Sequence, residues 1–187
     1  LKIDMEQLLY ERNQILKENR ELERRSEIEE FTNVMNKTAF RTHVSAELET
    51  MHQDQYVCLL VIDIDKFKSI NDTFGHLVGD QVLLHVVKVL KEVLRSSDFI
   101  GRIGGDEFCV FMKNILSLPY LYERLDEILD RLVNTRIEDR QVLSASTGVC
   151  MSNHICRYDE IFQKADEAMY HAKHAGGNCY DITELST

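Results

Sequence analysis

Residues 99–112 read Phe-Ile-Gly-Arg-Ile-Gly-Gly-Asp-Glu-Phe-Cys-Val-Phe-Met, two short apolar runs separated by paired glycines and paired acids. Glycine supplies the positive φ angles of a tight turn, so this stretch predicts a β-hairpin with an acidic tip. A hairpin joins antiparallel strands and interrupts any series of parallel β-α-β crossovers. The stretch therefore favours an α+β fold in which helices pack on a largely antiparallel sheet.

The rest of the chain alternates between helical and strand periodicity around this hairpin. Helices are predicted over residues 36–52, 79–94, 118–133 and 158–174, and further strands over residues 56–64, 142–151 and 178–182. The run at 56–64 is rich in Val, Leu and Ile, as in a strand buried on both faces. We therefore expect an α+β domain with a central, largely antiparallel sheet flanked by helices.

The first 30 residues have the pattern of a coiled coil. They contain no Gly or Pro, and an apolar residue recurs at intervals of seven, at Leu1, Leu8, Ile15 and Leu22. We predict a stalk over residues 1–30 that forms a homodimer with a second copy, followed by one domain over residues 31–187. A single amphipathic helix that folds back on the domain is the alternative. The dimer is favoured over it, because so narrow an apolar face covers little core and the charge is too dense for burial. The start at Leu1 rather than Met suggests a longer chain upstream.

Charge and composition exclude several classes of protein. The 187 residues include 22 Lys and Arg against 32 Asp and Glu, a formal net charge of -10, so nucleic-acid binding through bulk charge is not expected. The longest apolar run, residues 56–62, is too short to cross a bilayer, and we expect no membrane contact in this segment. Five cysteines without a Cys-x-x-Cys pair fit reduced core thiols. The expected localisation is cytoplasmic.

Four carboxylates are placed to meet at one end of the sheet. Asp63 and Asp65 end the strand at 56–64, and Asp106 and Glu107 form the hairpin tip. Neighbouring strands lie about 4.8 Å apart, so these acids would repel one another unless a cation lies between them. Oxygen ligands suit Mg²⁺ or Mn²⁺. An exposed acidic turn is the alternative reading of either pair, because so short a motif recurs by chance.

Lysines beside the acids are candidates to bind phosphate. Lys66, Phe67 and Lys68 follow the first acidic pair, and their cations and backbone amides could hold phosphates next to a metal. Lys173, near the end of the last helix, is a further candidate, although each lysine taken alone is better explained as a solvated surface residue. Neither a P-loop nor a Rossmann glycine motif is present in the sequence. A site in which a bound metal ion holds the triphosphate therefore remains as the way to bind a nucleotide.

These residues resemble the GGDEF family of diguanylate cyclases. The resemblance is carried by the intact signature Gly104-Gly105-Asp106-Glu107-Phe108 and by the segments at residues 63–72, 75–80, 144–149 and 168–173. It covers about residues 29–182, and three motifs in the right order are far more specific than any one. The resemblance implies a fold like that of nucleotide cyclases and polymerase palms.

The implied activity is condensation of two GTP molecules into cyclic di-GMP with loss of two pyrophosphates. By the resemblance, Asp63, the carbonyl of Ile64 and Asp106 hold metal, with two Mg²⁺ or Mn²⁺ ions in each half-site. Asp106 is also the proposed base, and Glu107 supports the second ion or the hairpin. We therefore expect each subunit of a homodimer to bind one GTP, and an upstream sensory domain to control the stalk.

Guanine selection is expected from Asp80 and Asn71. A carboxylate at Asp80 matches the N1–H and N2–H donors of guanine, whereas adenine has an acceptor at N1 and no N2 amine. Asn71 can complete this pattern. His76 either contacts the nucleotide or begins a helix, and the two readings are equally supported.

The segment Arg95-Ser96-Ser97-Asp98 is similar to the RxxD product-inhibition site of the family. A guanidinium can pair with phosphate or stack on guanine, and the Asp98 carboxylate can accept from a guanine edge. The resemblance therefore implies that cyclic di-GMP is an inhibitor as well as the product.

The chain departs from the family pattern at two places. In residues 29–37, Asn33 and Lys37 stand where the family usually has Gly and Arg, which predicts an altered coupling between stalk and domain. Gly177 stands where the family often has Arg, so we expect one phosphate contact to be lost and GTP binding to be weaker.

Two functions of other classes compete with the cyclase. One is a catalytically silent receptor for GTP or cyclic di-GMP, against which the intact Asp63, Asp106 and Glu107 argue. The other is a structural dimerisation module, which GTP and Mg²⁺ would not stabilise against heat.

Overall fold

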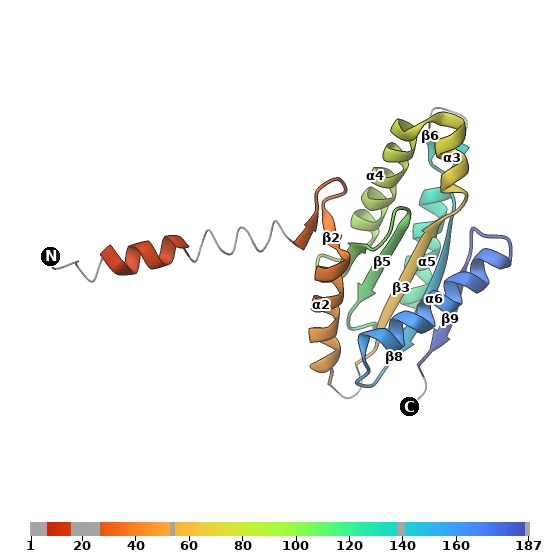
Figure 1. The fold of residues 1–187 in the computed structure, drawn as a ribbon. Coiled ribbons are helices and arrows are strands. Elements are labelled where there is room, and N and C mark those ends of the chain that lie inside the picture. Colours follow the sequence, from red (N-terminus) through yellow and green to blue (C-terminus); the bar gives the residue numbers. More distant parts are fainter. Residues whose placement is uncertain (1–6, 16–26, 53–54, 138–140, 186–187) are drawn as a thin grey trace.

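A seven-stranded sheet forms the middle layer of the domain, with strand order β1-β2-β4-β5-β3-β8-β9 (Figure 1). The computed structural model describes residues 7–15, 27–52, 55–137 and 141–185. The strands of the sheet are β1 (Ile28–Glu29), β2 (Val34–Asn36), β3 (Val57–Ile64), β4 (Phe99–Arg102), β5 (Glu107–Met112), β8 (Ala145–Ser152) and β9 (Tyr180–Glu184). The strands β6 (Arg136–Ile137) and β7 (Gln141–Val142) form a separate two-stranded ribbon.

Most strand pairs are antiparallel. The pairs β1–β2, β4–β5, β3–β5 and β3–β8 are antiparallel, whereas β2–β4 and β8–β9 are parallel. The helices that cover the sheet are α2 (Lys37–Glu49), α3 (Phe67–Phe74), α4 (His76–Val93), α5 (Leu118–Val133) and α6 (Tyr158–His174). The expected α+β class, with a central and largely antiparallel sheet flanked by helices, is confirmed.

Strand β3 lies at the centre and is buried along its whole length. Its side chains alternate between the two faces of the sheet. Leu60 and Ile62 belong to the core beneath α4 and α5, and Leu59 and Val61 belong to the core beneath α2 and α6. Two helical layers therefore enclose β3, which explains its continuous apolar sequence.

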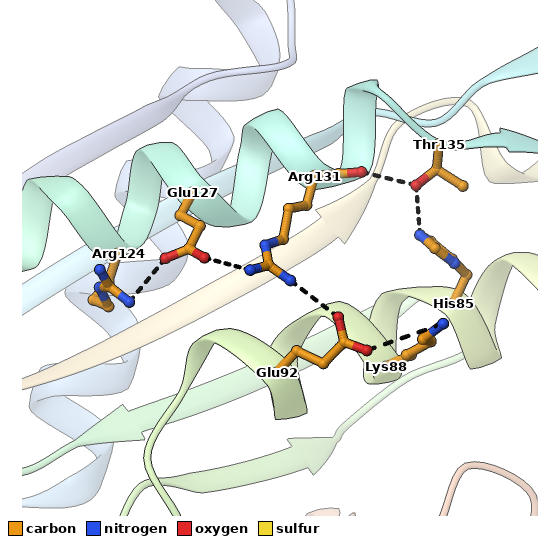
Figure 2. Close-up of polar contacts among 7 residues, drawn as sticks. All are labelled: His85, Lys88, Glu92, Arg124, Glu127, Arg131 and Thr135. Atoms are coloured by element: carbon orange, nitrogen blue, oxygen red, sulfur yellow. Dashed lines mark hydrogen bonds and ion pairs between the residues drawn. The ribbon is translucent and has the colours of Figure 1, made fainter.

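Helices α4 and α5 are joined on their outer surface by a chain of ion pairs (Figure 2). The Arg131 guanidinium lies 2.6 Å from a Glu127 oxygen and 3.0 Å from a Glu92 oxygen. Glu127 also accepts from Arg124 at 2.8 Å. Such half-exposed pairs each contribute little to stability, so the buried apolar layer beneath them holds the two helices on the sheet.

The observed elements differ from the predicted ones mainly near β3 and at the N-terminus. Helix α4 begins at His76 rather than at residue 79, and the short helix α3 and the β1–β2 hairpin were not predicted. Strand β8 begins at Ala145 rather than at residue 142, and β9 lies two residues later than predicted. Helices α5 and α6 have the predicted bounds.

The predicted stalk is described only in part. Residues 7–15 are helical, and Leu8 and Ile15 of the heptad seam are exposed there. Residues 1–6 and 16–26, with Leu1 and Leu22, lie outside the described residues, so the dimeric coiled coil stays a prediction. Within the described part of the chain, no helix has both the length and the hydropathy needed to cross a membrane.

Candidate active site

The acidic ends of β3 and β5 meet at one edge of the sheet. Asp63 faces Glu107 across the antiparallel β3–β5 pair. The Ile64 N–H donates to the Asp106 carbonyl oxygen at 3.2 Å, which fixes the hairpin tip against the end of β3. Asp63 is only 5% exposed. The structure therefore brings together Asp63, Ile64, Asp106 and Glu107, the residues to which the resemblance assigns the metal.

Lys173 approaches this edge from the last turn of α6. Its Nζ lies 2.7 Å from Asp63 Oδ1, although the two residues are 110 positions apart in sequence. The side chain of Lys173 is 45% exposed while that of Asp63 is 8% exposed. The ammonium group thus sits at the mouth of the site, with one side on Asp63 and the other toward solvent.

The electrostatics of the site disfavour unpaired carboxylates. Burial raises the pKa of Asp63 against the opposing hydrogen bond from Lys173, and the nearby charges of Asp106 and Asp65 raise it further. The pKa of Glu107 is raised by burial and then by Asp63 and Asp106. The pKa of Lys173 is raised, first by its hydrogen bond to Asp63. A bound cation would relieve this repulsion.

The donor set fits Mg²⁺ or Mn²⁺ in an open site. Among the described residues, no three Asp, Glu, His or Cys side chains form a ready-made metal cluster. Mg²⁺ is commonly bound through one or two carboxylates and completed by substrate phosphates and water. Asp63, Asp106 and the Ile64 carbonyl are oxygen donors of that kind, and Lys173 lies where phosphates would approach.

Asp65 does not join the other three acids in the way that the sequence suggested. Its carboxylate accepts hydrogen bonds from the hydroxyls of Ser144 and Ser146, at 2.8 and 2.6 Å, and from the backbone N–H of Asn178 at 2.9 Å. Each carboxylate oxygen thus accepts at least one hydrogen bond from the protein, and these bonds tie Asp65 to the start of β8 and to the turn after α6.

The segment predicted to bind phosphate forms the start of α3. Lys66 adopts a left-handed conformation with φ 56° and precedes the helix, and Lys66 and Lys68 are exposed. The Phe67 ring packs against the core, so only the backbone of Phe67 is available to a ligand. Among the described residues no side chain caps α3, which leaves its first N–H groups available to an anion.

The predicted guanine residues lie on α3 and α4. Asn71 is half-buried, whereas His76 and Asp80 are exposed. Sequence reasoning missed Gly79, where a Cβ atom would overlap the Asn71 side-chain amide. Gly79 therefore lets the two helices approach and fixes the place of Asn71. The Asn71 carbonyl also accepts from the Gly75 N–H at 2.9 Å, at the junction of the helices.

The predicted inhibitory residues lie at the other end of α4. This helix has 18 residues and is about 27 Å long, and Arg95 lies two residues beyond its C-terminal end, whereas His76 begins it. Asp98 is 9% exposed, and its carboxylate accepts from the backbone N–H of Arg95 at 3.0 Å and of Lys113 at 3.5 Å. The Arg95 guanidinium is exposed and lies 4.4 Å from the ring centroid of Tyr120, a residue that sequence reasoning missed.

A groove of about 330 Å³ borders Arg95 and Asp98. Ile28 and Met35 of the β1–β2 hairpin and Lys91 of α4 contribute to its lining. The structure therefore separates two regions, an acidic edge with Lys173 and a basic groove at the far end of α4.

Both departures from the family pattern have a structural consequence. Asn33 adopts φ 55°, the left-handed conformation for which asparagine is better suited than most residues, and its carbonyl accepts from Lys91 Nζ at 2.9 Å. Gly177 has φ 75°, and a Cβ atom there would lie 2.9 Å from the Asp65 carboxylate. An arginine at 177 would therefore disturb this turn as well as add a charge.

Comparison with known proteins identifies relatives of the whole domain. A family model described as "Diguanylate cyclase, GGDEF domain" matches residues 26–179. Probable diguanylate cyclase DgcC of Escherichia coli (strain K12) is 38% identical over 160 residues, which cover 81% of this chain and 42% of DgcC. Probable diguanylate cyclase DgcT of the same strain is 35% identical over 153 residues, 79% of this chain and 34% of DgcT. The chain thus spans less than half the length of these two relatives.

Solved structures share the fold. The coiled coil and GGDEF domain of DgcB from Caulobacter crescentus, in complex with c-di-GMP, matches with a TM-score of 0.83 and 26% identity over 95% of both chains. Diguanylate cyclase SiaD from Pseudomonas aeruginosa, in complex with its activator SiaC, matches with a TM-score of 0.78 and 27% identity, over 95% of this chain and 69% of that chain.

Proposed function

The chain belongs to the GGDEF domain family of diguanylate cyclases, and on that premise we propose that it condenses two GTP molecules into cyclic di-GMP and two pyrophosphates. The observation that carries the proposal is the convergence of Asp63, Glu107 and Lys173 at one edge of the sheet. This edge combines anionic ligands for a cation with a cation for a phosphate, which is the charge pattern that phosphoryl transfer needs.

In this proposal Asp63, the Ile64 carbonyl and Asp106 hold Mg²⁺ or Mn²⁺, two ions in each half-site, with Glu107 supporting the second ion. A bound divalent ion lowers the pKa of a coordinated hydroxyl and neutralises charge on the phosphates. In this proposal Asp106 takes the proton of the 3′-hydroxyl, whose oxygen attacks the α-phosphorus of the other GTP as pyrophosphate leaves.

Substrate binding is assigned to the two sides of this edge. Lys66, Lys68 and Lys173, with the backbone N–H of Phe67, hold the phosphates. The Asp80 carboxylate accepts from the guanine edge and the Asn71 side chain completes the pattern. The exposed His76, the first residue of α4, is a further nucleotide contact in this proposal. The acceptor at Asp80 selects GTP over ATP, because adenine has no donor at N1 or C2.

The reaction requires two copies of the chain. Each copy binds one GTP, and a symmetric cyclic product closes only when two sites face each other. We assign this pairing to the stalk at residues 1–30, under an upstream sensory domain of a longer cytoplasmic protein. The coiled coil that accompanies the GGDEF domain in DgcB supports this assignment.

Product inhibition is assigned to Arg95 and Asp98. Arg95 is exposed beside a groove and can pair with a phosphate of cyclic di-GMP or stack on its guanine. The Asp98 carboxylate accepts a hydrogen bond from the backbone N–H of Arg95 and so holds Arg95 in place. Its remaining lone pairs can accept hydrogen bonds from the ligand.

Turnover of GTP in the presence of Mg²⁺, with the product identified by mass, tests the proposal. Wild-type protein should form cyclic di-GMP, and Asp106→Ala should lower the rate about 100-fold or more. Asp159→Asn is a matched control, because this exposed α6 acid pairs with Arg41. Binding of GTP without formation of any product would instead identify a silent receptor. If GTP and Mg²⁺ do not raise the melting temperature, the chain is better described as a structural dimerisation module.

A further inference from the structure

Three segments that are distant in sequence meet at the carboxylate of Asp65. Oδ1 accepts from the Ser146 hydroxyl at 2.6 Å, and Oδ2 accepts from the Ser144 hydroxyl at 2.8 Å and the Asn178 N–H at 2.9 Å. The Asp65 N–H in turn donates to the Ser144 carbonyl at 3.0 Å. Asp65 thus joins the end of β3 to the start of β8 and to the turn that follows α6.

That turn has a backbone that few residues adopt without support. Gly176, Gly177 and Asn178 have φ values of 122°, 75° and 51°. The Gly176 N–H donates to the Lys173 carbonyl at 3.4 Å, and the Gly177 N–H to the Ala172 carbonyl at 3.2 Å, a pair of bonds that closes the helix end. The bond from Asn178 to Asp65 then anchors the turn to β3.

The anchored turn carries Lys173. Its carbonyl takes part in the helix-end bonds, while its side chain reaches back 2.7 Å to Asp63, two residues before Asp65. The end of β3 therefore holds the end of α6 at two points, through a side-chain ion pair and through the backbone of Asn178. The Lys173 side chain has four rotatable bonds, so its ammonium is held in one place only where both the helix end and the ion pair to Asp63 restrain it.

We propose that Asp65 is a positioning residue, which fixes the turn at residues 176–178 and thereby aims the Lys173 ammonium between Asp63 and the phosphates of GTP. The inference rests on the proposed function, because it deepens the role of the same site. In this account Asp65 acts on the turn and not on metal or phosphate, because protein donors already fill three of the about four acceptor positions of its carboxylate.

The same geometry explains why Gly177 lacks a side chain. A Cβ atom at this position would lie 2.9 Å from Asp65 Oδ2, which is the oxygen that accepts from Asn178. Because residue 177 is not an arginine, this end of α6 has one cation fewer for the phosphates. Lys173 is then the cation whose position depends on Asp65.

The test is a double-mutant cycle on binding of 3′-deoxy-GTP, which keeps the triphosphate but cannot cyclise. Asp65→Ala and Lys173→Ala should each weaken binding about 10–100-fold, by analogy with residues that orient a ligand-binding group. If Asp65 acts through Lys173, the double variant binds no more weakly than Lys173→Ala. Effects that multiply in the double variant overturn the proposal.

A second measurement tests the proposal even if Asp65→Ala folds poorly, and it needs no nucleotide. Asp65→Asn keeps the shape of the side chain but replaces one acceptor oxygen with a donor. The ¹⁵Nζ and ¹Hζ signals of Lys173 in the free protein should shift toward those of a solvated lysine in this variant and stay unchanged in Asp159→Asn. Unchanged Lys173 signals in Asp65→Asn also overturn the proposal.

The two proposals fail in different ways. If the wild-type protein binds no 3′-deoxy-GTP, the proposed function fails, while the Lys173 signals still decide whether Asp65 positions the ammonium. If the wild-type protein binds it and Asp65→Ala binds it equally well, the positioning role alone is wrong.

Discussion

At Asp63 the needs of binding and of folding oppose each other. Burial raises the pKa of its carboxyl, so the folded protein binds a proton at Asp63 more readily than the unfolded chain does. The resulting stability is present at low pH and is lost as pH rises from the unfolded to the folded pKa. At neutral pH the ionised Asp63 therefore weakens the fold that it serves.

Asp63→Asn should raise the melting temperature at pH 7 in the absence of metal and nucleotide, and should abolish cyclase turnover. Each kcal/mol gained by removing this buried charge corresponds to a rise of about 2–4 °C in the melting temperature for a chain of this size. Lys173 loses its partner in this variant, but its half-exposed ammonium keeps water. A melting temperature that falls at pH 7 would contradict this account of Asp63.

Arg95 offers a prediction that is independent of the catalytic edge. Arg95→Ala should raise the concentration of cyclic di-GMP needed for half inhibition about tenfold or more, because a charge-assisted hydrogen bond contributes about 1.5–3 kcal/mol. Initial rates at low product should be unchanged. Inhibition curves that coincide for Arg95→Ala and wild type would remove Arg95 from the inhibitory site.

Single residues were predictable where their chemistry is local. Asp63, Asp106 and Glu107 follow strand or hairpin signals, and their meeting was expected from sheet geometry alone. The partners of Asp65 were not predictable, because Ser144 and Asn178 reach it from 79 and 113 positions away. A DxD pattern shows two carboxylates and gives no sign of which one the fold uses for support.

At the level of elements, the close approach of α6 to β8 depends on Gly148. A Cβ atom there would overlap the backbone of Ala165 and Met169 on α6. Gly148→Ala should therefore destabilise the fold by about 1–3 kcal/mol through overpacking. Gly105→Ala is the matched control for thermal unfolding, because its Cβ would meet nothing within 4 Å. Equal melting temperatures in the two variants would show that α6 shifts without cost.

The α4–α5 contact contains a histidine, His85, whose pKa the fold lowers. Burial lowers the pKa of His85, and the Lys88 ammonium beside it lowers it further, while Glu92 opposes them (Figure 2). The unfolded chain thus binds a proton at His85 more readily, and stability is lost as pH falls below about 6.5.

His85→Gln should flatten the fall in melting temperature between about pH 7 and pH 5.5. A glutamine can still hydrogen-bond Thr135, which contacts the His85 ring in the wild type. The exposed His52 supplies the control variant His52→Gln. A slope that is the same in His85→Gln and wild type would exclude His85 as a source of acid sensitivity.

Helices α5 and α6 were predicted to the residue, whereas the short elements α3 and β1 were missed. Helix α5 has Ser117 as its N-cap, which accepts from the Tyr120 N–H, and four buried residues on one face. Helix α3 has eight residues. Its apolar positions Phe67, Ile70 and Phe74 all pack on the core, but they span only about two turns, which is too short a run to stand out as a helical period. Strand β1 has two residues, and it forms because β2 pairs with the distant β4.

On the scale of the whole molecule, the sequence indicates the α+β class, and the comparisons confirm the family. The heptad pattern of the stalk predicts a dimer, whereas the register and spacing of two copies depend on contacts that one chain does not contain. The catalytic account nevertheless requires that second copy, because the site at Asp63 and Lys173 serves one GTP.

The most direct test of the central claim is the rate of cyclic di-GMP formation from GTP and Mg²⁺ across a series of protein concentrations. The account predicts that the rate per chain rises with concentration and levels off once analytical ultracentrifugation shows the chain to be dimeric. Absence of cyclic di-GMP from a chain that is dimeric and binds GTP would contradict the account.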